Sequence, residues 1–161
     1  MSKRGNIFVK RRLTPGQLRA VASLRLDDAR LLLNSGQNAR MNGAMYMGGF
    51  VIECLLKALL LDRHPNLHGA VDRTKLSEPD REVHALLYSH DLDKMLGFLP
   101  EVRTKLESIT DASGRSQWPS FNDVCEEWTV YARYSTAQAP PAEARRFLDT
   151  VEEVKEWLRQ L

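Results

Sequence analysis

The feature that most constrains this chain is residues 39–62, a segment that is apolar nearly all round when drawn as a helix. Its apolar side chains recur on every side of the helix: Met45, Met47, Val51, Ile52, Leu55, Leu56, Ala58 and Leu59. A helix of this kind must be surrounded by other elements, because apolar surface left in water costs free energy. The segment therefore predicts the central helix of a bundle, closed by Pro65.

The rest of the chain predicts further helices and no strand. Thr14-Pro15 is a favourable helix start for residues 17–33, and residues 142–161 form the clearest amphipathic pattern. Residues 63–80 are predicted to form a long loop. Shorter helices are predicted after this loop, over residues 82–87, 91–98, 101–109 and 121–131. The predicted fold is all-α: an antiparallel up-and-down bundle of four to five main helices with short extra helices.

The charge is unevenly distributed along the 161 residues, which form a single domain's length of chain. Residues 1–12 hold five bases and no acid, whereas the other 149 residues hold 18 bases and 21 acids. We therefore divide the chain into a basic tail, residues 1–13, and a helical bundle, residues 14–161. The tail is interpreted as a solvated or partner-docking arm, with RNA contact as the alternative.

The sequence also indicates where the chain resides. The longest apolar stretch, Met47 to Leu61, is interrupted by Glu53 and Lys57 and is short for a bilayer, so no membrane contact is expected. The basic N-terminus is not followed by the apolar run of a signal peptide. Cys54 and Cys125 lie far apart and outside any metal-binding spacing. A cytoplasmic location is therefore predicted.

A polar stripe on the central helix is the main candidate site. Tyr46, Glu53 and Lys57 fall within about 40° of one another on the helix surface. Glu53 and Lys57 also have the i,i+4 order that favours an ion pair. Such a stripe must be paired, face a groove, or both, because an unpaired buried charge is costly. A structural ion pair beside a core tyrosine and a ligand- or partner-facing groove both remain open.

Two further pairs of residues are candidates. Asp91 can cap the helix that follows it, and His90 is placed to meet an anion or a carboxylate of another helix, such as Glu53. Arg133 and Tyr134 combine a guanidinium with an aromatic ring, which suits phosphate or base contacts but is also common at helix ends.

Common catalytic and metal-binding motifs are absent from the sequence, including HExxH, GxSxG and the P-loop. Gly48-Gly49 lies inside the central helix, where close helix packing is the expected role. His64 and His68 have helical spacing, but Pro65 between them spoils a metal pair. We expect neither a metal nor another cofactor.

Taken together, these segments resemble the HEPN domain, the higher-eukaryote and prokaryote nucleotide-binding domain. The resemblance covers roughly residues 14–161 and rests on four parts in order: the run from Ala44 to Leu61 with its Glu53 and Lys57, then His90-Asp91-Leu92, then Trp128 with Ala132-Arg133-Tyr134-Ser135, then the last helix through Leu158. It implies a helical bundle that commonly forms homodimers. Some members assist a small nucleotidyltransferase, and others are metal-independent ribonucleases, frequently toxins.

The resemblance favours the nucleotidyltransferase-associated branch, and it implies a toxin–antitoxin-type pair with the nucleotidyltransferase. It implies that Glu53, Lys57, His90, Arg133 and Tyr134 line a groove for a nucleotide, a substrate phosphate or the partner enzyme. The alternative is a ribonuclease, whose family motif is an Arg followed four to six residues later by His near the last main helix. No histidine follows Arg133 here. The one literal match, Arg63 to His68, lies after the central helix, so a nuclease would need a relocated site using His68 or His90.

Overall fold

The computed structural model describes residues 13–68, 72–110, 114–116, 118–128 and 134–161. Its three long helices are α1 (Pro15–Asn34), α2 (Met41–Arg63) and α7 (Pro141–Leu158). Four shorter α-helices connect α2 to α7: α3 (Glu78–Leu86), α4 (Leu92–Gly97), α5 (Pro100–Ser108) and α6 (Trp118–Glu127). Apart from an isolated bridge between Thr110 and Ser116, these residues contain no β-structure. The predicted all-α bundle is confirmed.

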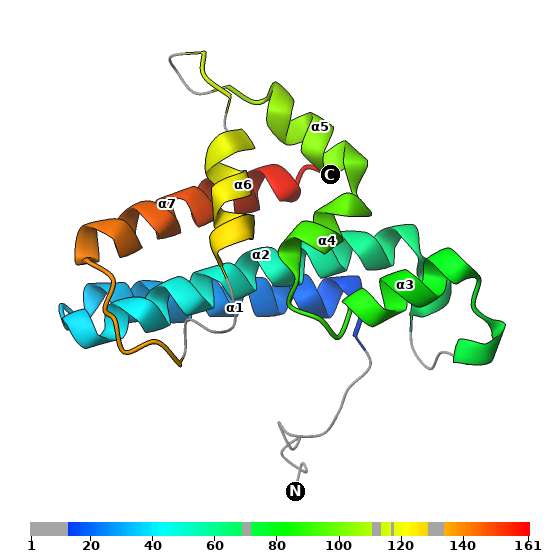
Figure 1. Ribbon diagram of the computed structural model, residues 1–161, viewed down its shortest axis with the longest axis horizontal. Helices are drawn as coiled ribbons and strands as arrows, with labels where there is room; N and C mark the ends of the chain where they lie inside the picture. The colour runs from blue at the N-terminus through cyan, green and yellow to red at the C-terminus, as the bar shows by residue number, and fades with distance from the viewer. Residues whose placement is uncertain (1–12, 69–71, 111–113, 117, 129–133) are drawn as a thin grey trace, which may run out of the picture.

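Helices α1 and α2 lie side by side as an antiparallel hairpin, and α7 packs against both (Figure 1). Helix α7 runs in the same direction as α2 in this view, because the chain turns back through the shorter helices between them. The direction therefore alternates from α1 to α2 but not from α2 to α7. Among the shorter helices α4 packs against α2, and α3, α5 and α6 pack against α4.

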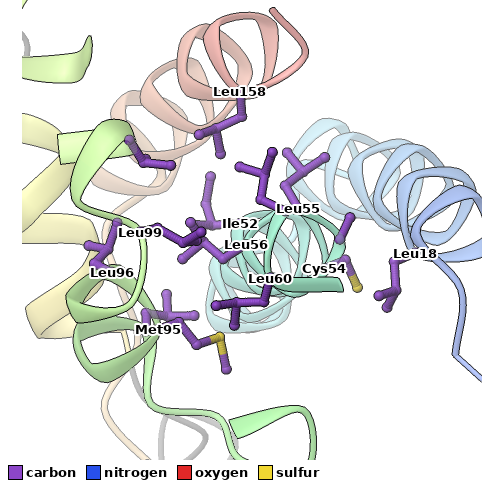
Figure 2. Packing of buried hydrophobic residues seen from close by; sticks show 14 of the residues in the cluster. Leu18, Ile52, Cys54, Leu55, Leu56, Leu60, Met95, Leu96, Leu99 and Leu158 are labelled. Atoms are coloured by element: carbon purple, nitrogen blue, oxygen red, sulfur yellow. The ribbon is translucent and has the colours of Figure 1, made fainter. Parts of the chain in front are cut away.

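Helix α2 occupies the centre of the bundle, as its apolar circumference predicts. Leu56, Leu60 and Ile52 are fully or almost fully buried. Figure 2 shows α2 residues between Leu18 of α1, Leu158 of α7 and the Met95–Leu99 region. By length and composition alone, the helix over Asn38–Arg63 is long and apolar enough to cross a membrane, whereas the sequence predicts a span of Met47 to Leu61 that is too short. However, 78% of the most apolar 18-residue stretch of this helix is buried inside the protein, as is equally expected of a core helix.

The helix boundaries follow their local capping signals. The Thr14 side chain accepts a hydrogen bond from the Gln17 amide at the start of α1, as predicted. After α1 the chain turns at Gly36, whose φ of +68° is in the left-handed region that glycine adopts without strain. Helix α3 begins at Glu78 rather than at residue 82, because Ser77 caps the Asp80 amide. The predicted loop over residues 63–80 therefore includes the first turn of α3.

Candidate functional site

Glu53 and Lys57 of the polar stripe form a charged cluster with His90. Lys57 Nζ donates to Glu53 Oε1 at 2.7 Å, and both residues are buried, at 3% exposure for Glu53 and 6% for Lys57. The second carboxylate oxygen, Glu53 Oε2, lies 2.9 Å from His90 Nδ1. The predicted ion pair and the predicted contact between His90 and Glu53 are both confirmed. We call Glu53, Lys57 and His90 the charged cluster.

The histidine of this cluster is held by one nitrogen and is half exposed. Because a carboxylate only accepts, Nδ1 must donate its proton, and a neutral ring then carries its lone pair on Nε2. The side chain is 46% exposed. The arrangement therefore presents a positioned imidazole next to solvent, which can accept a hydrogen bond from a ligand or a partner protein.

The charged cluster also borders a groove between α1 and α2. This α1 groove has a volume of about 390 Å³, and its lining is mainly apolar, including Leu18, Val21, Met47 and Phe50. Glu53 and Lys57 contribute to the same lining. The polar stripe is therefore paired and also faces a groove, so the two interpretations of the sequence are not exclusive.

Three aromatic rings connect the charged cluster to a second groove. Tyr46 and Trp128 are stacked, with ring centroids 5.9 Å apart and an interplanar angle of 26°. Phe50 packs edge-to-face with both rings, with its ring centroid 5.0 Å from that of Tyr46 and 5.7 Å from that of Trp128. Its centroid also lies 6.0 Å from that of the His90 ring. The indole Nε1 of Trp128 also donates to the Tyr46 carbonyl oxygen at 3.3 Å.

The adjacent glycines Gly48 and Gly49 of α2 make close packing possible here, as the sequence predicted. A Cβ on Gly49 would lie about 1.9–2.1 Å from three atoms of the Trp128 indole. A Cβ on Gly48 would lie 2.6 Å from Leu148 and 2.9 Å from Phe147 of α7. Gly49 therefore admits the indole against the helix backbone, and Gly48 admits α7.

The second groove, which we call the loop groove, lies between α2, the start of α7 and the segment that precedes α7. Its volume is about 450 Å³. Tyr46, Trp128 and Phe147 supply aromatic surface, while Asn42, Ser135, Gln138 and Glu143 are polar residues of the lining. This mixture of an apolar wall and a few polar groups is typical of small-molecule sites.

Asn42 holds the loop groove together, and the sequence analysis missed it. Its Nδ2 donates to the Ala137 carbonyl oxygen at 2.5 Å, and its Oδ1 accepts from the Ala139 amide at 2.8 Å. These two hydrogen bonds join the start of α2 to a segment about 95 residues later. A single asparagine near a helix start carries no local signal for such a contact.

The other predicted site residues have different environments. Asp91 caps α4, as predicted: it accepts from the Lys94 amide at 3.0 Å, which holds the pKa of its carboxyl below the ordinary value. Tyr134 is 70% exposed and adjoins Ser135 of the loop groove. Arg133 lies outside the described residues, so the Arg133-Tyr134 pair is not placed as a unit.

The literal nuclease match, Arg63 to His68, has its side chains engaged separately. An Arg63 guanidinium nitrogen lies 2.6 Å from Glu101 Oε1, and His68 Nε2 lies 2.8 Å from the Leu61 carbonyl oxygen. His64 contacts Asp80 instead, at 2.8 Å. Among the described residues, no group of three or more His, Cys, Asp or Glu side chains is placed to hold a metal ion.

Cys54 lies at the wall of the α1 groove, and its thiol is buried. Burial, and next the neighbouring Glu53 carboxylate, raise the pKa of Cys54 to about 11 from 9.0. Only the thiolate attacks alkylating agents, so at pH 8 we expect Cys54 to react about 100-fold more slowly than an ordinary thiol. Its rate should rise about tenfold per pH unit toward pH 11.

The measurement is iodoacetamide alkylation followed by mass spectrometry, in a Cys125→Ser background that leaves one thiol. The same variant unfolded in urea gives the ordinary rate. A folded-state rate that levels off below pH 10 would contradict the raised pKa.

We compared the chain with family models, with curated proteins and with solved structures, and none of the three comparisons gave a match. The resemblance to the HEPN domain therefore stays a prediction, and the function is proposed from the geometry of the loop groove and the charged cluster.

Proposed function

We propose that this chain is a non-catalytic module of the HEPN type that binds a nucleotide-like ligand in the loop groove. The observation that carries the proposal is the stacked pair of Tyr46 and Trp128 in the wall of a groove of about 450 Å³. Aromatic side chains bind the flat faces of nucleobases by stacking, and this contact tolerates any base.

The charges of the loop groove indicate which part of the ligand it takes. Glu143 contributes a carboxylate to the lining, and the described lining has no Lys or Arg. A carboxylate repels a phosphate but accepts hydrogen bonds from ribose hydroxyls and base amino groups. We therefore assign the base and the sugar to the loop groove.

The charged cluster would serve the second part of the proposal, a partner protein. The resemblance suggests a minimal nucleotidyltransferase, with this chain present as a homodimer in a toxin–antitoxin-type pair in the cytoplasm. His90 supplies a positioned, half-exposed imidazole on the surface next to the aromatic rings. Co-expression with the product of the neighbouring open reading frame tests this part. Co-elution with a small nucleotidyltransferase, weakened by His90→Ala, supports it, and separate elution contradicts it.

The ligand part is tested with the four ribonucleosides, which carry no phosphate. We expect saturable binding in calorimetry, a raised melting temperature, and an affinity about tenfold lower in Tyr46→Ala, because a stacking surface is lost. Asn42→Ala should weaken binding as well, since it releases the segment at Ala137 and Ala139.

Tyr88→Ala is the matched control, because Tyr88 is a 54% exposed tyrosine that is not part of the loop groove lining. It should bind as the wild type does. The proposal fails if no nucleoside binds, or if Tyr46→Ala binds as tightly as the wild type.

The ribonuclease alternative gains no specific support from the geometry, because Arg63 and His68 each contact a different partner. An assay of RNA cleavage with Arg63→Ala, His68→Ala and Arg133→Ala separates the two functions. Cleavage that any of these substitutions abolishes would establish the nuclease and overturn the proposed non-catalytic role.

A further inference from the structure

A small pocket lined by basic side chains lies at the end of the molecule away from the loop groove. It is formed by the 3-10 helix η3 (Arg73–Lys75) and by α3, which Figure 1 places at the same end of the molecule as the C-terminal end of α2. Its volume is about 220 Å³, and it is lined by Arg73, Leu76, Arg81, His84 and Ala85. We call it the basic pocket.

The charge of the basic pocket is weakly neutralised. The Arg81 guanidinium lies 2.9 Å from Glu78 Oε2, but these side chains are 52% and 73% exposed, so water screens the pair. Arg73 makes no ion pair with any carboxylate among the described residues. The nearby Asp72 carboxylate is engaged by the Thr74 amide and hydroxyl and by Lys75.

The floor of the pocket strengthens electrostatic contacts inside it. His84 and Leu76 are each 8% exposed, and the His84 ring packs 5.2 Å from the Tyr88 ring. Apolar and aromatic surface on one side lowers the local dielectric constant, which increases the attraction between the guanidinium groups and an anion.

We propose that the basic pocket binds a phosphate group, either as the free anion or as a phosphomonoester. Guanidinium groups match the geometry of phosphate oxygens with paired hydrogen bonds, and two of them line this pocket together with a histidine. A phosphate dianion displaces Glu78 from Arg81, because an exposed ion pair at i,i+3 spacing is weak. This site is separate from the loop groove and does not rest on its proposed ligand.

The test is a titration of the full chain with inorganic phosphate at constant ionic strength, with chloride as the replaced anion. The His84 ring signals are followed by NMR and are assigned by their loss in His84→Gln. We expect a saturable shift of these signals at millimolar phosphate, and the same shift with glycerol 1-phosphate if an ester is accepted. Saturation by inorganic phosphate alone assigns the site to the free anion, and saturation by both extends it to phosphomonoesters.

Three variants make the result specific. Arg73→Gln with Arg81→Gln should weaken binding more than tenfold, because two charge-assisted contacts are lost. Glu78→Gln should tighten it about twofold, because the competing carboxylate is removed. Arg159→Gln is the matched control: Arg159 also pairs with a carboxylate at i,i+3, Glu156, at 3.1 Å, and should bind as the wild type does.

The arginine substitutions lie at exposed side chains, and circular dichroism verifies that the variants retain their helices. The proposal is overturned if the His84 signals show no saturable shift with either phosphate compound. It is also overturned if the double arginine variant binds phosphate as tightly as the wild type or as Arg159→Gln.

Discussion

Replacing Glu53 with alanine should lower the free energy of unfolding by about 3–5 kcal/mol, the loss typical of breaking a buried ion pair. The variant leaves the ammonium group of Lys57 buried without the carboxylate that lies 2.7 Å from it. It also removes the acceptor of His90 Nδ1. The stranded lysine accounts for most of the effect, because an uncompensated charge in the core keeps its full desolvation cost.

The double variant distinguishes this cause from a simple loss of contacts. Lys57→Met removes the charge and retains most of the apolar stem, so Glu53→Ala with Lys57→Met should be more stable than Glu53→Ala alone. Urea unfolding of the wild type, the two single variants and the double variant completes the cycle. Additive losses, with no coupling between the two positions, would show that the pair does not act as a unit.

Replacing Gly49 with alanine should be the second large loss, about 1–3 kcal/mol or more. The added methyl group would stand about 2 Å from the Trp128 indole, far inside van der Waals contact. The ring must therefore move away from α2, which breaks its stack on Tyr46 and its hydrogen bond to the Tyr46 carbonyl oxygen. We expect a lower midpoint in thermal unfolding and weaker nucleoside binding, because Trp128 lines the loop groove.

Gly16→Ala is the matched control for the glycine substitution. Gly16 also lies in a helix, α1, but nothing stands within 4 Å of its added Cβ. There the substitution should be neutral or stabilise the protein by about 0.5–1 kcal/mol, since alanine favours the helix. Equal stability of Gly49→Ala and Gly16→Ala would mean that the indole does not need the space.

The parts of the site that sequence predicted are those with a local pattern. The Glu53–Lys57 pair follows from i,i+4 spacing, and the Asp91 cap from its position before a helix. The contact of His90 with Glu53 spans 37 residues and entered the sequence analysis as one of several roles for that histidine. Which of these roles His90 takes depends on how the turn between α3 and α4 packs on α2. No local spacing in the sequence specifies that packing.

The loop groove was beyond sequence analysis for a related reason. Its walls come from the start of α2, from Trp128 and from residues 135–147. Asn42 joins the start of α2 to the later segment through backbone groups of Ala137 and Ala139. Every residue except proline has both a backbone N–H donor and a C=O acceptor. The residue types at Ala137 and Ala139 therefore give no sign of the contact with Asn42. The fold was more accessible, because an apolar circumference dictates a central helix whatever covers it.

The central position of α2 has a consequence for synthesis of the chain. Helix α7, which covers α2 at Gly48, is separated from it by residues 64–140. At a translation rate of ~5–20 residues per second, that stretch takes about 4–15 seconds to make. During this interval the hairpin of α1 and α2 stands on the ribosome with apolar surface uncovered, so α2 is where a nascent-chain chaperone would be expected to bind.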